Sequence, residues 1–421
     1  MRETGLEALR EEIATCMRCG NCQAVCPVYR QVRREPAVAR GKVALAAALL
    51  SGELEPTAEL ARQLDLCLSC NACTDACPSG VRVDDVILAA RAEVVRRRGL
   101  DWFRTAVFAA VKRPRVLSAG VATAAKLQGL ALAAGPEEGL GVVRLPMPGA
   151  RRAILPRLPA RPLRGGERPE EHARLDRRVA FYPGCMVTYV YPEIGRALID
   201  VLRTVGVEAV LPTEDRCCGI PLLMHGDEAG ARAMARDVVA TLDALGGEVV
   251  LTACPTCGSA LKRQIPRLLA GDPLWEARAE RLAARALDAT EYLASAVDLP
   301  EAGTAGVRAT YHDPCHLARG QGVRSQPRGL ITRVAGLELV ELGSPETCCG
   351  GAGSFLLTHP ELAARIGAQK TSEIDGTGAE LVVTSCPGCR MQLTDSLRRH
   401  GRTHRVLHTV EVLAEAIVHN E

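Results

Sequence analysis

Residues 66–78 read Leu66-Cys67-Leu68-Ser69-Cys70-Asn71-Ala72-Cys73-Thr74-Asp75-Ala76-Cys77-Pro78, with the four cysteines separated by two, two and three residues. A tight loop of this kind holds three corners of a cubane [4Fe–4S] cluster, and a proline after the fourth cysteine is typical of it. The same pattern occurs earlier as Cys16-Met17-Arg18-Cys19-Gly20-Asn21-Cys22-Gln23-Ala24-Val25-Cys26-Pro27. Two copies of the pattern predict two cubane clusters.

The fourth cysteine of each copy is expected to bind the other cluster, as in two-cluster ferredoxins. Structural zinc is bound by two Cys-x-x-Cys pairs and has no use for a third cysteine at that spacing. Disulfide frameworks belong to short secreted chains. We therefore assign one cubane to Cys16, Cys19, Cys22 and Cys77, and the other to Cys26, Cys67, Cys70 and Cys73.

Length and charge set the broad class of the protein. A chain of 421 residues is too long for one ordinary core, so two or three domains are expected. The first residues are charged and contain no apolar signal core, which predicts a cytoplasmic protein. The formal charge of +3 falls to about −1 if each oxidised cubane with its thiolates adds roughly −2. Bulk charge therefore gives no reason to expect a nucleic-acid partner.

The region around the two motifs is expected to be a helical ferredoxin domain over residues 1–99. Strong helix formers fill Ala39–Ser51 before Gly52, and further helices are predicted over Thr57–Leu66 and Val83–Arg98. Residues 100–177 are expected to hold two helices, over 102–111 and 116–134, and then a linker. The helices either pack on the module or a partner subunit, or lie on a membrane surface. The proline- and arginine-rich residues 136–177 predict extended chain without a core.

The second half is an internal repeat, with copies over residues 178–300 and 301–421. Short β-branched runs alternate in both copies with helical stretches such as Ile194–Val205 and Glu228–Leu245, which predicts βαβ units on a parallel sheet. The expected fold class is thus α+β multidomain, with an N-terminal α-helical ferredoxin module followed by two tandem α/β Cys-Cys-Gly repeats with parallel sheets.

Each repeat carries five cysteines just past its strands, where open α/β sheets bind ligands. The first set is Cys185, Cys217, Cys218, Cys254 and Cys257, and the second is Cys315, Cys348, Cys349, Cys386 and Cys389. Adjacent cysteines can straddle two irons of an open cluster, and the glycine after each pair is expected to let the backbone approach the sulfides. A zinc site with a redox disulfide is the alternative. The eighteen cysteines divide as four, four, five and five, which favours clusters.

These motifs resemble the iron–sulfur subunit of glycolate oxidase over essentially the whole chain. Beside Cys16–Pro27 and Cys67–Gly80, the shared motifs are Arg40-Gly41-Lys42, Cys348-Cys349-Gly350 and Thr358-His359-Pro360. The repeats are similar to those of heterodisulfide reductase catalytic subunits and lactate-utilisation iron–sulfur proteins. In the former, five cysteines hold a non-cubane [4Fe–4S] cluster, so the resemblance implies two such clusters here. Some glycolate oxidase subunits lack part of a Cys-x-x-Cys pair, whereas both pairs are complete in this chain.

Three functions are compatible with these features. No strand is followed by Gly-x-Gly-x-x-Gly, so we expect no flavin in this chain. Hydride removal from an alcohol needs a flavin, which predicts an FAD-containing partner and an electron-transfer subunit of a glycolate or D-lactate (2-hydroxyacid) dehydrogenase. The electron acceptor would be a quinone or another carrier, with peripheral attachment to the inner face of the membrane left open. The alternatives are a disulfide reductase and a protein with purely structural metal sites.

Three histidines lie close to the repeat cysteines in sequence. His312 and His316 flank Cys315, and His225 follows the first Cys-Cys-Gly. A hydrogen bond to a metal ligand or a surface position is the simpler interpretation, and no catalytic role is assigned. The sequence leaves open the substrate, the electron acceptor, the stoichiometry and the order of the clusters.

Overall fold

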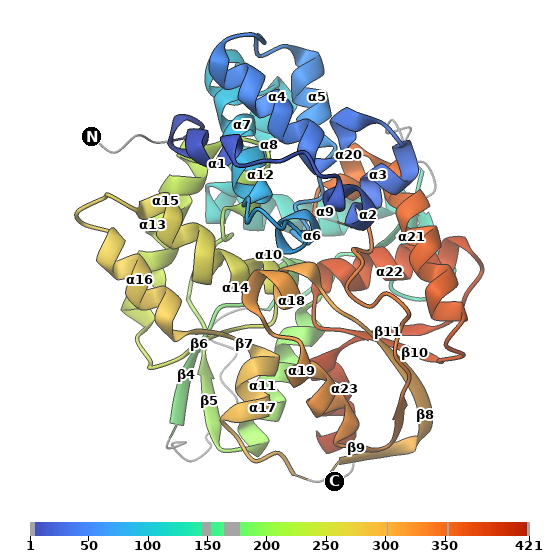
Figure 1. The fold of residues 1–421 in the computed structure, drawn as a ribbon. Helices are drawn as coiled ribbons and strands as arrows, with labels where there is room; N and C mark the ends of the chain where they lie inside the picture. The colour runs from blue at the N-terminus through green and yellow to red at the C-terminus, as the bar shows by residue number, and fades with distance from the viewer. Residues whose placement is uncertain (1–4, 145–152, 164–176, 301, 352, 419–421) are drawn as a thin grey trace.

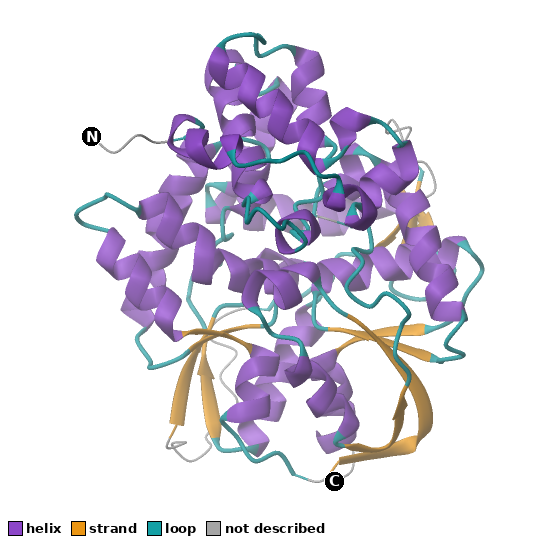
Figure 2. Ribbon diagram, viewed as in Figure 1, coloured by secondary structure: helices purple, strands orange, loops and turns teal. Residues whose placement is uncertain are grey.

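The computed structural model describes residues 5–144, 153–163, 177–300, 302–351 and 353–418. An N-terminal helical module lies over two α/β units whose sheets stand side by side (Figures 1 and 2). Both sheets are parallel, so the expected fold class is confirmed.

The helical module forms where the sequence predicts it. Thr57 caps the predicted second helix, because its hydroxyl accepts a hydrogen bond from the Leu60 amide at 3.1 Å. Gly52 ends the first predicted helix with a left-handed φ of 80°. The helices are η1 (Glu7–Leu9), α1 (Arg10–Ala14), α2 (Asn21–Val25), α3 (Pro27–Val32), η2 (Glu35–Ala37), α4 (Ala39–Ser51), α5 (Ala58–Asp65), α6 (Ala72–Asp75) and α7 (Val83–Arg98).

Two further helices, α8 (Trp102–Val111) and α9 (Pro114–Ala131), follow the module. Phe108 of α8 is buried against the first repeat. Helix α9 buries none of its residues, and Trp102 and Leu130 are 81% and 78% exposed. Helix α8 therefore packs on the body of the protein, whereas α9 does not bury a face against it. Among the described residues, no helix has both the length and the apolar character that a bilayer crossing needs.

The expectation that residues 136–177 form extended chain without a core is wrong where the structure describes them. A three-stranded antiparallel sheet consists of β1 (Leu132–Ala134), β2 (Leu140–Val143) and β3 (Ile154–Pro156). Leu163 is buried in the core of the repeats, and the Ile154 amide donates to Asp395 Oδ1 at 2.6 Å. Short apolar runs between the prolines are long enough to pair as strands. Residues 145–152 and 164–176 lie outside the described chain.

The two repeats have the same sheet topology. The first sheet has the order β5-β4-β6-β7 and the second the order β9-β8-β10-β11, so each reads 2-1-3-4 in its own strand numbering. The bounds are β4 (Arg177–Phe181), β5 (Val207–Val210), β6 (Val250–Thr252), β7 (Ala286–Asp288), β8 (Ala302–His312), β9 (Val334–Leu339), β10 (Leu381–Thr384) and β11 (Arg405–His408).

The repeats share one hydrophobic core, although they are separate in sequence. Four helices fill the space between the two sheets (Figure 1): α11 (Pro192–Thr204), α17 (Ala289–Ser295), α19 (Ser325–Thr332) and α23 (Thr409–Val418). On the outer faces lie α13 (Glu228–Leu245), α15 (Ile265–Leu269) and α16 (Glu276–Arg285) of the first repeat, and α21 (Pro360–Asp375) and α22 (Pro387–Arg399) of the second.

The carboxyl ends of both sheets face the helical module (Figure 1). The order 2-1-3-4 places the topological switch point between the first and third strands, where open α/β sheets bind ligands. The short elements at this end are α10 (Gly184–Tyr189), α12 (Ile220–Met224), α14 (Pro255–Ser259), the π-helix η3 (Ala260–Gln264), α18 (Cys315–Gln321) and α20 (Phe355–Thr358). Module helices α3, α6 and α7 contact α21, α18 and α12. The module therefore covers both carboxyl ends.

Candidate metal centres

The two ferredoxin-like loops have the same unusual backbone. Arg18 and Ser69, each before the middle cysteine of its loop, have φ values of 57° and 49°. The residues after that cysteine, Gly20 and Asn71, have φ values of 94° and 59°. Left-handed conformations of residues other than glycine cost about 1–3 kcal/mol and cluster at ligand sites. The same turns at the same positions therefore indicate that both loops are wound around a ligand.

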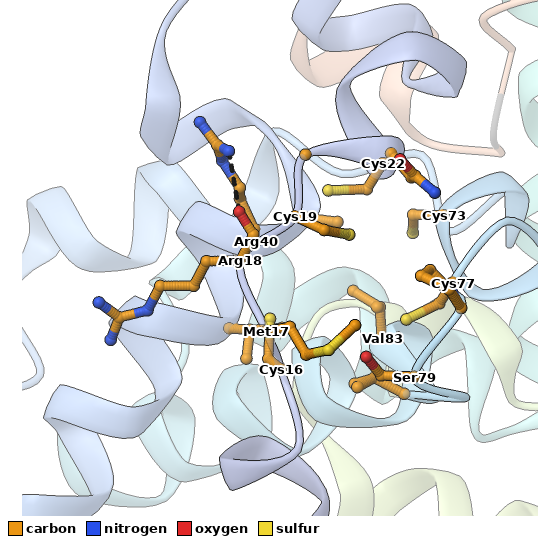
Figure 3. Close-up of a pocket in the computed structure, with 16 residues that line it drawn as sticks. Cys16, Met17, Arg18, Cys19, Cys22, Arg40, Cys73, Cys77, Ser79 and Val83 are labelled. Carbon is orange, nitrogen blue, oxygen red and sulfur yellow. Dashed lines mark hydrogen bonds between the residues drawn. The ribbon is translucent and has the colours of Figure 1, made fainter.

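Cysteines from both motifs line one pocket, which we call the first ferredoxin site (Cys16, Cys19, Cys22 and Cys77). Figure 3 shows the four side chains around this pocket, with Cys73 at its border. Cys77 comes from the second motif and the other three from the first. The structure thus brings together the first predicted set, including the crossed fourth cysteine.

The second ferredoxin site (Cys26, Cys67, Cys70 and Cys73) is a neighbouring pocket that contains the second predicted set. Its crossed cysteine, Cys26, caps α3 by accepting a hydrogen bond from the Tyr29 amide at 3.4 Å. Burial raises the pKa of Cys26 and of Cys73. Such thiols would ionise only with a compensating positive charge, which a metal supplies.

The Arg40-Gly41-Lys42 motif on α4 lies between these two sites. Arg40 Nη1 donates to the Arg18 carbonyl at 3.1 Å, drawn as a dashed line in Figure 3. Lys42 lines the second ferredoxin site, is 1% exposed and donates to the Pro36 carbonyl at 2.9 Å. Burial lowers the pKa of Lys42 to about 8. A buried cation beside a set of thiolates offsets their charge, a role that sequence reasoning did not assign to Lys42.

The thiols of each repeat form one connected cluster, with contacts in the same order. In the repeat-1 site the hydrogen-bonded series runs Cys185–Cys217–Cys218–Cys257–Cys254. In the repeat-2 site it runs Cys315–Cys348–Cys349–Cys389–Cys386. The last four members of each series are at most 8% exposed. Both predicted sets of five are therefore brought together.

Each repeat site contains a thiol that is acidic for a cysteine. Hydrogen bonds with Cys217 and with Cys257 lower the pKa of Cys218 to about 6. A hydrogen bond with Cys348 lowers the pKa of Cys315 to about 6. A thiolate at neutral pH is the form that binds a metal.

Proline and glycine shape the repeat sites. Pro255 and Pro387 are the first residues of α14 and α22. Gly350 has a φ of 91°, and a Cβ there would lie 3.0 Å from Ile366 of α21. The glycine after the cysteine pair is therefore required by the turn and its neighbouring helix. Gly184 leaves room for a thiol of the repeat-1 site, because a Cβ there would lie 2.6 Å from Cys257 Sγ.

The three histidines near the cysteines differ in their surroundings. His225 Nε2 lies 2.6 Å from Ser354 Oγ, away from the thiols. His316 bridges the second ferredoxin site and the repeat-1 site. Its Nε2 lies 3.0 Å from the Ser69 carbonyl oxygen, and its Nδ1 lies 3.0 Å from Thr256 Oγ1. His312 is 1% exposed and lies beside the Cys349 thiol, whose pKa it helps to lower, but neither ring nitrogen makes a hydrogen bond of normal geometry with a described residue.

The donor sets fit iron–sulfur clusters. Thiols make up most of the donors in all four sites, and they favour zinc, copper(I) and iron–sulfur clusters over hard cations. The first and second ferredoxin sites each combine a Cys-x-x-Cys-x-x-Cys loop with one distant cysteine, the donor set of a [4Fe–4S] cluster.

Comparison with known proteins agrees with this chemistry. The family model of the 4Fe-4S dicluster domain matches residues 12–81, and that of the cysteine-rich domain matches residues 179–262 and 309–394. A crystal structure of a hypothetical protein from Helicobacter pylori has a similar fold, with a TM-score of 0.56 at 8% identity over 93% of this chain and 70% of that one.

Three relatives show the extent of the similarity. The probable glycolate oxidase iron-sulfur subunit of Bacillus subtilis is 29% identical over 97% of this chain and 95% of its own. The glycolate oxidase iron-sulfur subunit of Escherichia coli is 29% identical over 96% of this chain and 94% of its own. Lactate utilization protein A of Geobacillus kaustophilus is 32% identical over 56% of this chain and 98% of its own. The chain therefore belongs to the family of cysteine-rich iron–sulfur proteins that includes glycolate oxidase iron-sulfur subunits and lactate utilization protein A.

Proposed function

We propose that this chain is the iron–sulfur electron-transfer subunit of an FAD-dependent 2-hydroxyacid dehydrogenase, with glycolate or D-lactate as substrate. The flavin belongs to a partner subunit, and the final acceptor is a quinone or another carrier. Bound clusters would accept and release electrons one at a time, a chemistry that thiol side chains cannot supply. The observation that carries the proposal is the continuous series of thiol sites through the molecule.

The two ferredoxin sites adjoin each other. Cys73 lines both pockets, so only its own loop separates the two sets of ligands. The second ferredoxin site in turn adjoins the repeat-2 site, since Cys26 and Cys70 pack in the same apolar cluster as Cys315 and Cys348. Burial, and then the charge of Cys315, raise the pKa of Cys70. These contacts support the order first ferredoxin site, second ferredoxin site, repeat-2 site.

His316 connects the repeat-1 site to the second ferredoxin site and to the repeat-2 site. Its imidazole contacts Ser69, which lies in the loop of the second ferredoxin site, and Thr256, which lies between Cys254 and Cys257. Its backbone follows Cys315 directly. One side chain therefore spans the loops of three sites, which supports a branch to the repeat-1 site.

The burial of the thiols favours electron transfer over disulfide reduction. Eight of the ten repeat cysteines are at most 8% exposed, and the helical module covers the carboxyl ends of both sheets. A disulfide substrate would need contact with a cluster, whereas an electron needs only a series of close centres. The alternative function is a heterodisulfide-reductase-like activity, and the test must be able to detect it.

The test is anaerobic affinity purification from the native host, followed by addition of glycolate or D-lactate. We expect an FAD-containing protein to co-purify and the visible cluster absorbance to bleach on addition of substrate. The isolated chain should show no bleaching with either acid. Rapid reduction of a thiol disulfide by the isolated chain with an artificial electron donor would overturn the proposal.

A further inference from the structure

His312 is a buried polar side chain beside the Cys349 thiol. It is the last residue of β8 and is 1% exposed. No described residue makes a hydrogen bond of normal geometry with Nδ1 or Nε2. Buried polar groups are nearly always paired, and an unpaired one costs about 1–3 kcal/mol. A buried imidazole without a well-formed hydrogen bond to any described residue therefore points to a partner that is not part of the polypeptide.

The position of His312 identifies that partner. A ring nitrogen of His312 and the sulfur atoms of Cys349 and Cys389 all lie within 4.8 Å of one another. Metal–nitrogen bonds of about 2.0–2.1 Å and metal–sulfur bonds of about 2.3 Å allow three such atoms to bind one ion. The imidazole is therefore placed to bind the same ion as the Cys349 and Cys389 thiols of the repeat-2 site, and not only to contact a metal-bound thiol from outside.

Among the described residues, the repeat-1 site has no histidine equivalent to His312. Tyr182 occupies the matching place, three residues before Cys185 as His312 is three before Cys315. The Tyr182 hydroxyl donates to the Arg216 carbonyl at 2.7 Å, so its polar atom is already paired with the backbone. The two sites thus share the five-thiol arrangement and differ in one donor.

We propose that His312 is a nitrogen ligand of the metal centre in the repeat-2 site, binding the same ion as Cys349 and Cys389. The repeat-1 centre would then have sulfur ligands only, and the repeat-2 centre sulfur and nitrogen. This inference rests on the proposed occupation of the repeat-2 site by a cluster. Since histidine ligation raises the potential of iron–sulfur centres, the repeat-2 centre would have the higher potential of the two.

The test uses the full-length chain, purified anaerobically with either natural-abundance or ¹⁵N-labelled histidine. Pulsed EPR spectra recorded through a redox titration should contain the strong coupling of a directly bound nitrogen, and labelling should change it. His312→Tyr, which installs the residue of repeat 1, should abolish that coupling and lower one midpoint potential. His312→Gln provides a second variant if the tyrosine does not fit.

His408→Asn is the matched control. His408 ends β11, is also 1% exposed and stands in the same row of the sheet, because Thr384 pairs with both His312 and His408. Its Nδ1 accepts from the Val410 amide at 3.3 Å, an interaction that asparagine can retain. The strong coupling should persist in this variant.

Two results would overturn the inference, and they have different meanings. If Cys348→Ser lowers the iron content but the unaltered chain shows no strong nitrogen coupling, the repeat-2 cluster exists and His312 does not bind it. If Cys348→Ser changes neither iron content nor spectra, the repeat-2 site holds no cluster, and the proposed relay fails as well.

Discussion

Replacing Gly184 by alanine should damage the repeat-1 site from within. The new Cβ would stand 2.6 Å from Cys257 Sγ, whereas such atoms rest at about 3.5–4.0 Å, so the sulfur must move by about 1 Å. Gly184 also has a φ of 65°, which costs an alanine about 1–2 kcal/mol. Overpacking adds about 1–3 kcal/mol. We expect a total destabilisation of about 2–5 kcal/mol and a repeat-1 cluster that is lost or incomplete.

Gly206 provides a control for the backbone term alone. Its φ is 72°, and a Cβ there would meet no atom within 4 Å. Gly206→Ala should therefore cost about 1–2 kcal/mol and leave the clusters intact. The assays are anaerobic urea unfolding and iron and sulfide per chain, where Gly184→Ala should lose about four irons. Equal iron content in the two variants, with identical visible spectra, would refute the convergence of the repeat-1 thiols on a cluster.

Three further predictions concern other parts of the molecule. Cys77→Ser should give the same EPR spectrum as Cys16→Ser, and a match to Cys67→Ser would contradict the crossed arrangement of the fourth cysteines. Lys42→Met should lower the midpoint potential of the second ferredoxin site in a redox titration. A charge at about 8 Å contributes about 2 kcal/mol at an effective dielectric constant of about 20, or roughly 90 mV. An unchanged potential would show that Lys42 does not influence this cluster. Burial raises the pKa of Asp288 from 3.8 to about 6. Between these two values the native state binds more protons than the unfolded state. The contribution of Asp288 to stability therefore falls as pH rises through about 6. Asp288→Asn should remove this fall, worth about 1.4 kcal/mol between pH 5 and 8 in anaerobic unfolding, and a pH profile parallel to that of the unaltered chain would count against the raised pKa.

The sequence predicted the parts of the molecule that depend on local spacing. Cysteines two or three residues apart must share a loop, and βαβ repeats place their strand ends at one edge of a sheet, so all four thiol sets could be named in advance. The helix ends at Gly52 and Thr57 were also predicted, because caps depend on residues within one turn.

The remaining features depend on contacts between distant segments. Strands β7 and β11 are defined by their parallel pairing with β6 and β10. Strand β3 is defined by its antiparallel pairing with β2. The surroundings of His312 in the second repeat and the small space at Gly184 in the first arise only where the strand ends of each repeat come together. No pattern along the chain reports such contacts.

The central claim is that the eighteen cysteines hold four iron–sulfur clusters in series. Anaerobic metal and labile-sulfide analysis of the full-length chain tests it most directly. Four clusters would give about sixteen irons with a similar amount of sulfide, and no stoichiometric zinc. About eight irons together with one or two zinc ions per chain would show that the repeats hold zinc, and would contradict the account.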